Sequence, residues 1–286
     1  MAELEIMKYS IADENEFLLS PADRVVDDWP MMSNPAPVLL LTGFYLYFVL
    51  SLGPKLMEHR KPFDLKYVMI VYNFCQVVFS AWLCSKLFSS FSVLTYIYTH
   101  ACSPMPRHNN PMIILLNTAS WWYFMSKVVE LLDTLFFVLR KKQNQVTVLH
   151  VYHHAIMVIS TWGYLKYARG EQGIIPGFLN SVVHVIMYSY YLLAALGPRV
   201  QKYLWWKKYL TKLQLGQFVL ILLYLSTMII LDCQVPRGLT LYMSFNTFIF
   251  LILFINFYKK SYSKGTKPSL MNTCHLQPIN SNEKND

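Results

Sequence analysis

The chain has 286 residues, of which 55 % are hydrophobic and only 14 % are charged, and its mean hydropathy is +0.32. Soluble domains carry about 25 % charged residues, so this composition excludes an ordinary soluble domain and indicates an integral membrane protein. The formal net charge is +9, but the basic residues stand in short segments between apolar runs. This placement argues against nucleic acid as a partner.

Seven apolar runs approach or exceed the roughly 20 residues that a helix needs to cross a bilayer. They lie at 35–53, 65–88, 112–139, 146–164, 174–196, 213–231 and 239–257. The fold class that we predict is therefore an all-α integral membrane protein with seven transmembrane helices in a single catalytic domain, 35–257. An acidic lumenal segment, 1–34, precedes it, and a polar cytosolic tail, 258–286, follows it and is expected to be disordered.

The basic residues are concentrated on one side of this topology, in the segments 55–66, 140–142 and 199–212 and in the tail. By the positive-inside rule the C-terminus is cytosolic and the N-terminus is lumenal or external. Topology alone explains the charge, and a further role in binding an anionic substrate explains it equally well.

Two of the five cysteines, Cys102 and Cys233, fall in segments that this topology places on the non-cytosolic side. In an oxidising lumen the two could form a disulfide, and two free thiols are the alternative. Cys75 and Cys84 are expected to be small buried apolar residues, and Cys274 lies in the tail.

The third apolar run, 112–139, carries Lys127, Glu130 and Asp133 in K-V-V-E-L-L-D-T. A spacing of three places them along one slanting face of a helix. They could form a self-neutralising ion network that lets the helix sit in lipid. Charged residues at membrane depth are expensive, however, and more often mark a functional site.

Four histidines lie within apolar runs. His150, His153 and His154 form H-V-Y-H-H on one helix face, and His184 follows Asn180 by one helical turn in the next run. A rise of about 1.5 Å per residue places four groups at a similar depth, roughly 15–21 Å from the cytosolic helix ends: Lys127, Glu130, His153 and His184. Each polar side chain could instead be a satisfied interhelical hydrogen-bond partner.

The histidine cluster permits two kinds of chemistry. The H-x-x-H-H pattern also occurs in membrane di-iron desaturases and hydroxylases, but those need several such boxes, and the remaining histidines here are single. Imidazole itself can attack an activated acyl group and move protons near neutral pH, with Glu130 or Asp133 to orient it. A basic cytosolic rim would suit a phosphorylated carrier. A seven-span receptor or transporter without enzymatic activity is the remaining alternative.

The motifs together resemble one family. K-V-V-E-L-L-D-T (127–134), H-V-Y-H-H (150–154), N-S-V-V-H-V-I-M-Y-S-Y-Y (180–191) and T-K-L-Q-L-G-Q (211–217), in this order, resemble the very-long-chain fatty acid elongases. L-G-P-K-L-M-E-H-R-K-P-F (52–63) is similar to the first cytosolic loop of that family, and the likeness runs from about residue 29 to 265. It looks closest to the animal group that acts on saturated and monounsaturated chains.

The resemblance implies a 3-oxoacyl-CoA synthase of the endoplasmic reticulum membrane, which joins a long-chain acyl-CoA to malonyl-CoA and releases CO2 and CoA. It implies six helices in a barrel of two inverted three-helix units around an acyl tunnel, with a seventh helix outside. No permanently bound cofactor and no metal are expected; acyl-CoA and malonyl-CoA are substrates. Expected partners are the lipid bilayer, a second copy of the chain, and the reductases and dehydratase of the elongation cycle. The chain ends E-K-N-D, so a dilysine-type retrieval signal is not visible.

The resemblance also implies roles for individual residues. The middle histidine of the box, His153, would attack the acyl thioester to form an acyl-imidazole. The other residues of the implied catalytic set are His150, His154, His184, Asn180, Glu130 and Asp133. The implied CoA contacts are Lys127, Arg140, Lys142, Gln145, His150, Tyr190, Lys207, Thr211, Gln214 and Lys267. The preferred acyl chain length is not readable from the motifs.

Overall fold

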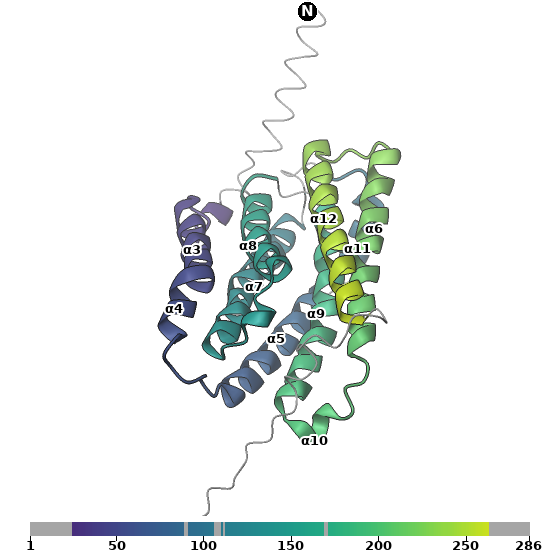
Figure 1. Cartoon of the computed structure of the whole chain (residues 1–286). Helices are drawn as coiled ribbons and strands as arrows, with labels where there is room; N and C mark the ends of the chain where they lie inside the picture. The colour runs from purple at the N-terminus through teal and green to yellow at the C-terminus, as the bar shows by residue number, and fades with distance from the viewer. Residues whose placement is uncertain (1–24, 89–90, 106–109, 111, 169–170, 263–286) are drawn as a thin grey trace, which may run out of the picture.

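The computed structural model describes residues 25–88, 91–105, 110, 112–168 and 171–262, and these residues form helices and no strands. Figure 1 shows the helices as a bundle, and the long helices run roughly along one common direction. The elements are α3 (Ala36–Tyr47), η1 (Phe48–Leu52), α4 (Gly53–Met57), α5 (Lys66–Leu87), α6 (Phe91–His100), α7 (Ile113–Leu139), η3 (Gln143–Gln145), α8 (Val148–Gly163), η4 (Tyr164–Ala168), η5 (Glu171–Gly173), α9 (Ile174–Ala195), α10 (Pro198–Gln201), α11 (Lys207–Ile230) and α12 (Arg237–Tyr262).

Five helical stretches among these residues are long and apolar enough to cross a membrane, which confirms a multi-span membrane protein. They are Ala36–Met57, Lys66–Leu87, Glu171–Ala195, Lys207–Ile230 and Arg237–Tyr262. Helix α7 is long but carries three charged residues near its middle, and α8 has only 16 α-helical residues before it continues as the π-helix η4. The prediction of seven spans therefore depends on these two helices.

Two helices extend beyond the apolar runs that predicted them. Helix α11 begins at Lys207 rather than at 213, and α12 continues to Tyr262, into the segment assigned to the tail. Helix α6 lies in a segment for which no element was predicted. Apolar runs locate the lipid-covered part of a helix, whereas the helix itself continues through lysines and tyrosines that reach the interface.

The long helices pack in a closed order. Helix α8 packs on α7, α7 on α5, α5 on α9, α9 on α11, α11 on α12, and α12 again on α8. Helices α3 and α4 lie beside this set, where α3 packs on α8 and α4 on α7 (Figure 1). The residues predicted to be catalytic come from α7, α8 and α9, which are all members of the closed order.

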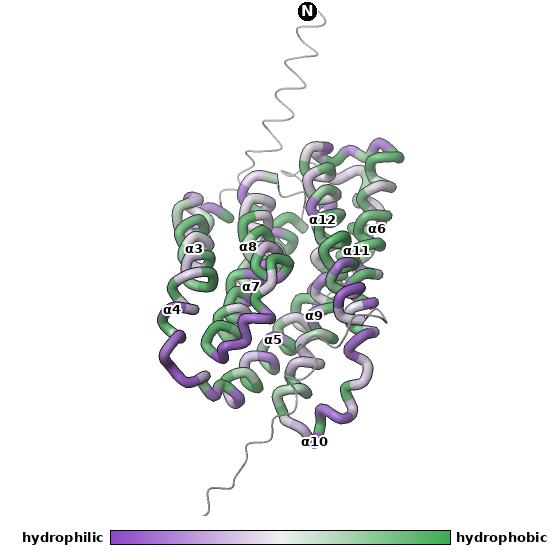
Figure 2. Tube along the Cα trace, in the orientation of Figure 1, coloured by the Kyte–Doolittle hydropathy of each residue, from purple (hydrophilic) through white to green (hydrophobic). Residues whose placement is uncertain are grey.

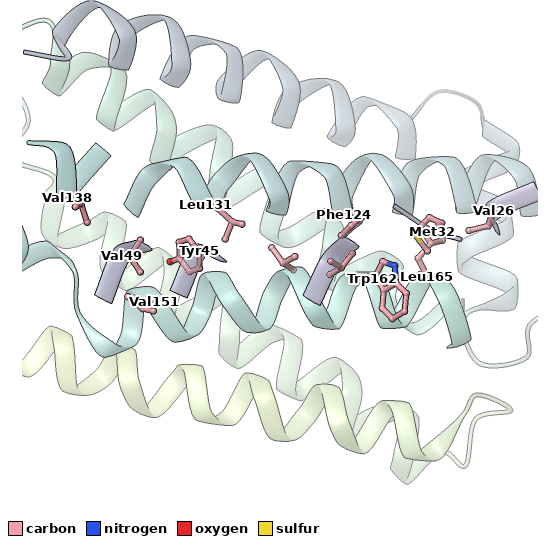
Figure 3. Close-up of a cluster of buried hydrophobic side chains, with 12 residues drawn as sticks. Val26, Met32, Tyr45, Val49, Phe124, Leu131, Val138, Val151, Trp162 and Leu165 are labelled. Atoms are coloured by element: carbon pink, nitrogen blue, oxygen red, sulfur yellow. The ribbon is translucent and has the colours of Figure 1, made fainter. Parts of the chain in front are cut away.

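A buried apolar cluster joins α3 to α7 and α8. Figure 3 shows its side chains in a row between α7 and α8, among them Phe124, Val138 and Trp162. Part of the segment before α3 is folded onto this cluster: Val26 and Met32 are fully buried, and the Trp162 indole donates a hydrogen bond of 2.9 Å to the Met31 carbonyl. Residues 25–34, the described part of the predicted N-terminal segment, thus contribute buried side chains to the core.

The helix ends differ in polarity from the helix bodies. Figure 2 shows hydrophobic colour along the helices and hydrophilic colour in the segment after α4 and around α10, at the same end of the bundle. These are two of the basic segments of the sequence. The structure thus gathers basic loops at one end, as the positive-inside argument expects.

The cysteines divide into two groups. Cys102 and Cys233 are joined by a disulfide, with Cα atoms 4.6 Å apart. The expectation that Cys75 and Cys84 are buried was wrong, because Cys75 is exposed and Cys84 is half-buried. Both lie on α5, and in a membrane protein a small apolar side chain can face lipid as readily as protein.

Candidate active site

Helices α7 and α9 meet at a buried polar cluster. The Lys127 ammonium lies 2.8 Å from Glu130 Oε1 and 2.8 Å from Asn180 Oδ1, and His184 Nδ1 lies 3.2 Å from the same Glu130 oxygen. Lys127 and Glu130 are each only 2 % exposed. The i, i+3 spacing on α7 and the i, i+4 spacing on α9 bring the four side chains together across the helix interface.

This cluster is an ion pair surrounded by polar partners. The Lys127 ammonium also lies 4.6 Å from the centre of the Tyr123 ring, and the Tyr123 hydroxyl donates to Asn180 Oδ1 at 2.8 Å. A buried ion pair is tolerated only where additional groups replace the lost water, and the amide and the ring do so here. The second carboxylate oxygen, Glu130 Oε2, is buried without a hydrogen-bond partner among the described residues.

The rings of the three box histidines contact one another edge-on along α8. The ring centres of His150 and His154 are 4.4 Å apart, and those of His153 and His154 are 5.4 Å apart. Thr147 caps the helix by accepting the backbone N–H of His150 at 3.2 Å, which fixes where the first turn begins. His150 Nε2 is buried and has no partner among the described residues. The box therefore holds one ring nitrogen whose hydrogen-bonding capacity the described protein does not use.

His153 lines a partly open cavity of about 220 Å³ between the helices. Tyr123 and Asn180 line the same cavity, so the α7–α9 cluster and the histidine box share one space. Gln217 of α11 and Phe250 of α12 complete this part of the wall, and the Phe250 ring centre is 4.9 Å from that of His153. The cavity brings an imidazole and an amide–lysine–carboxylate network to one site.

Away from this polar region the cavity wall is effectively apolar. Most wall residues are aliphatic or aromatic, and several hydroxyls are already bonded within the protein. Thr161 and Thr247 donate to main-chain carbonyls of their own helices, and the Ser160 hydroxyl lies 2.6 Å from that of Tyr242. A long apolar ligand would thus meet few unsatisfied polar groups.

Asp133 lies on α7 one turn beyond Glu130 and has a different partner. The Tyr188 hydroxyl donates to Asp133 Oδ2 at 2.8 Å, and the Tyr188 ring centre is 5.5 Å from that of His184. Asp133 thus reaches the histidines through Tyr188, whereas Glu130 contacts His184 directly.

The residues predicted to contact CoA occupy different positions. Lys127 belongs to the buried cluster. Beyond the end of α7, Arg140 Nη1 lies 2.9 Å from Met69 Sδ, Lys142 is half-buried and Gln145 is exposed. His150 is half-buried at the start of α8. Except for Lys127, this group lies where α7 and α8 meet the loop between them.

The second group lies where α9 meets α11. Tyr190 is buried and packs edge-on against Trp206, with ring centres 5.0 Å apart. Lys207 is exposed at the start of α11, Thr211 is buried one turn later, and Gln214 donates to Met187 Sδ at 3.5 Å. Lys267 lies outside the described residues.

Sequence reasoning missed three residues that the structure places in the site. Tyr123 precedes Lys127 by one turn, Gln217 ends the T-K-L-Q-L-G-Q motif, and Phe250 lies in the middle of α12. A helical-face argument extended backwards from Lys127 could have found Tyr123. Nothing in the apolar run of α12 distinguishes Phe250 from its neighbours.

In the described ranges no group of three or more His, Cys, Asp or Glu side chains is arranged to hold a metal ion.

Comparison with known proteins decides the family. The model of the GNS1/SUR4 family (ELO) matches residues 30–269. This chain belongs to that family. It is 46 % identical over 252 residues to very long chain fatty acid elongase 7 of Rattus norvegicus, which covers 87 % of this chain and 89 % of the relative.

Other relatives agree. The chain is 46 % identical over 244 residues to very long chain fatty acid elongase 7 of Drosophila melanogaster, covering 85 % and 74 % of the two chains. It is 41 % identical over 288 residues to very long chain fatty acid elongase 4 of Homo sapiens, covering 98 % and 91 %. The resemblance found in the sequence is thereby confirmed, and the relatives do not favour a desaturase, receptor or transporter.

Proposed function

We propose that this elongase-family member is a 3-oxoacyl-CoA synthase that lengthens a long-chain acyl-CoA by two carbons from malonyl-CoA. The observation that carries the proposal is the position of His153, an imidazole facing an apolar cavity beside the Lys127–Glu130–Asn180–His184 cluster. The cavity suits the alkyl chain, and the histidine lies where its thioester carbon would be presented.

In the first step the free ring nitrogen of His153 attacks the thioester carbon. The C–S bond breaks, CoA leaves as the thiolate and takes up the proton that the ring loses, and an acyl-imidazole remains. An acyl-imidazole keeps much of the reactivity of the thioester, so the carbon is still open to a carbon nucleophile. CoA can then depart before malonyl-CoA arrives.

In the second step malonyl-CoA loses CO2, and the electron pair of the broken bond forms an enolate of acetyl-CoA. The enolate carbon attacks the acyl carbon, the C–N bond breaks, and the electron pair of that bond returns to the His153 nitrogen. The ring then takes up one proton from water, which is the one proton that the overall condensation consumes. Negative charge develops on two oxygens during this step. The buried ammonium of Lys127 and the ring of His184 are the groups of the cluster that could stabilise it.

The remaining polar residues act as positioning groups in this proposal. Glu130 holds the Lys127 ammonium and His184, and Asp133 holds Tyr188, which packs against His184. Within the part of the chain that the structure describes, His150 Nε2 and Glu130 Oε2 are buried without partners, and each could bond a substrate polar group.

The proposed function also includes an arrangement of the chain in the membrane. The closed packing order of α8, α7, α5, α9, α11 and α12 supports a six-helix barrel, with α3 as the outer, seventh span. The basic end would face the cytosol and hold the CoA phosphates, with the N-terminus on the lumenal side of the endoplasmic reticulum membrane. Assembly with a second copy and with the other enzymes of the cycle belongs to the same proposal.

A general-base mechanism is the second candidate. Two buried atoms of the predicted catalytic set that have no hydrogen-bond partner among the described residues, His150 Nε2 and Glu130 Oε2, could take part in direct condensation without an acyl-imidazole. The overall reaction would be unchanged, and only the covalent intermediate would be absent.

The reaction is tested with the purified protein, a long-chain acyl-CoA and labelled malonyl-CoA, with labelled 3-oxoacyl-CoA as the readout. His153→Ala should lower the rate by roughly 10²–10⁴-fold or more, which is the usual range for loss of a central acid–base or nucleophilic group. Val148→Ala, on the same helix at a position 80 % exposed, is the matched control. Wild-type rates in His153→Ala would refute the proposed role of His153.

A further inference from the structure

Helix α5 turns polar side chains toward the protein interior, although none of the residues predicted to be functional lies on it. Asn73, Gln76 and Ser80 are buried, and Tyr72 is half-buried beside them, whereas Phe74 on the other face is exposed. Helix α5 packs on both α7 and α9, the two helices of the buried polar cluster. Inward polar residues on a membrane helix are either interhelical hydrogen-bond partners or part of a functional site.

The Tyr72 hydroxyl connects α5 with the second acidic residue of α7. The Gln76 amide, one helical turn along α5, donates to the Tyr72 oxygen at 3.0 Å. The same hydroxyl interacts with the Asp133 carboxyl group and with the Tyr188 hydroxyl. The Val129 carbonyl oxygen is 3.5 Å away, which is longer than an ordinary hydrogen bond between two oxygens. Because the Tyr72 oxygen accepts from Gln76, its own hydrogen remains available for Asp133.

The ring of Tyr72 is held by aromatic contacts with both neighbouring helices. Its centre lies 5.2 Å from that of Phe136 on α7 and 6.1 Å from that of Tyr188 on α9, and both pairs are edge-on. Tyr188 in turn donates to Asp133 Oδ2, and its ring centre lies 5.5 Å from that of His184. A continuous set of contacts therefore leads from α5 to the imidazole of α9.

His184 is held from two directions. Glu130 Oε1 lies 3.2 Å from His184 Nδ1, and the Tyr188 ring packs edge-on against the imidazole. One hydrogen bond fixes a single atom of a ring, so the tilt of the ring depends on its packing partner. Stabilisation of developing charge depends on where the donor points, and a misplacement of about 1 Å can cost roughly 10²-fold in rate.

We propose that Tyr72 and Gln76 are positioning residues for the condensation step. They hold the Asp133–Tyr188 pair in place, and that pair holds the ring of His184. The proposal rests on the proposed function, because it adds two residues of α5 to the second step of that reaction. Neither residue is among the described residues that line the cavity, so both act through the pair and not on the acyl chain.

The test measures kcat/KM separately for the two substrates with purified full-length protein. In a ping-pong reaction the value for acyl-CoA reports the acylation of His153, and the value for malonyl-CoA reports the step in which His184 acts. Tyr72→Phe keeps the ring contacts but removes the hydroxyl. It should lower kcat/KM for malonyl-CoA by roughly 10–10²-fold and leave kcat/KM for acyl-CoA unchanged. Loss of folded protein would instead lower both values by the same factor.

The order of the contacts is tested with a second variant. Gln76→Leu removes the donor to Tyr72 with a side chain of similar size, and it should lower kcat/KM for malonyl-CoA in the same direction. The double variant Tyr72→Phe with Gln76→Leu should be no slower than Tyr72→Phe alone, because Gln76 acts through the hydroxyl that is already absent. Two independent kinds of damage would multiply, and that result would contradict the connection.

Asn73 provides a matched control on the same helix. It is 3 % exposed, and its amide donates to the Met69 carbonyl of α5 itself at 2.7 Å. Asn73→Leu should leave both kcat/KM values unchanged, whatever it does to thermal unfolding. Tyr67→Phe removes a hydroxyl from α5 at a position 78 % exposed and should also leave them unchanged.

Two results for Tyr72→Phe would overturn the proposal. Both kcat/KM values could stay at the wild-type level, or both could fall by the same factor. Either result leaves the condensation reaction of the wild-type protein intact. Failure of the proposed function would appear differently, as no 3-oxoacyl-CoA from the wild-type protein.

Discussion

His184 Nδ1 lies 3.2 Å from Glu130 Oε1, so an imidazole of α9 and a carboxylate of α7 meet in the buried interior. The same oxygen accepts a hydrogen bond from the Lys127 ammonium. One carboxylate oxygen thus connects the Lys127 ammonium with a histidine, while the other oxygen is buried without a partner in the described part of the chain. This arrangement holds His184 next to the Lys127–Glu130 pair.

Breaking that pair should destabilise the protein strongly. Lys127→Met leaves the Glu130 carboxylate buried and uncompensated, and such losses usually cost about 3–5 kcal/mol. The double variant Lys127→Met with Glu130→Gln removes both charges and should recover part of this stability without recovering activity. Thermal unfolding in detergent measures the first effect and 3-oxoacyl-CoA formation the second. A single variant as stable as the wild type would show that the pair is not needed for folding.

The hydroxyl of Tyr188 should contribute to thermal stability and to kcat. Tyr188→Phe leaves Asp133 without its 2.8 Å donor, and an unmade buried hydrogen bond typically costs about 1–3 kcal/mol. We expect lower thermal stability and a reduced kcat. Tyr191→Phe is the control, because Tyr191 is 39 % exposed and touches Tyr188 only through its ring. Equal losses of thermal stability and kcat in Tyr188→Phe and Tyr191→Phe would contradict a specific role for the Tyr188 hydroxyl.

Gly43 in α3 and Gly53 in α4 offer a matched pair of glycine-to-alanine substitutions. A Cβ at Gly53 would lie 2.7 Å from Val138 Cγ1 and 2.8 Å from the Phe48 carbonyl oxygen, whereas a Cβ at Gly43 would meet nothing within 4 Å. Gly53→Ala should destabilise by about 1–3 kcal/mol through overpacking. Gly43→Ala should be neutral or stabilising by up to about 1 kcal/mol, because alanine favours the helix. Unfolding temperatures in the reverse order would contradict the close approach of α4 to α7.

The polar residues of the candidate site were easier to predict from the sequence than the residues around them. The i, i+3 and i, i+4 spacings and the common depth predicted that the α7 charges, the box and His184 would converge, because a helix in a bilayer has a fixed rise and must turn its charges inward. The partners within the cluster were not predictable, because a spacing gives a face and not a contact. That Glu130 bonds His184 while Asp133 bonds Tyr188 depends on how α7 and α9 are rotated against each other.

The ends of the helices and the residues of the cavity wall were harder to predict from the sequence. The apolar runs did not give the start of α11 or the end of α12, since lysines and tyrosines continue a helix beyond the lipid. Helix α6 was missed, although Val93 and Ile97 on it line the cavity. Lining residues such as Phe250 are aromatic positions in an apolar run, and only the packing of six helices distinguishes them from lipid-facing neighbours.

The central claim, that His153 carries the acyl group, is tested most directly by mass spectrometry. The purified protein is incubated with a long-chain acyl-CoA alone, digested and examined for an acyl mass on the peptide that contains His153, before and after addition of malonyl-CoA. We predict an adduct on His153 that disappears as 3-oxoacyl-CoA forms and that is absent from His153→Ala. Formation of 3-oxoacyl-CoA at the full rate with no acyl mass on any histidine would contradict the claim and leave His153 without the nucleophilic role.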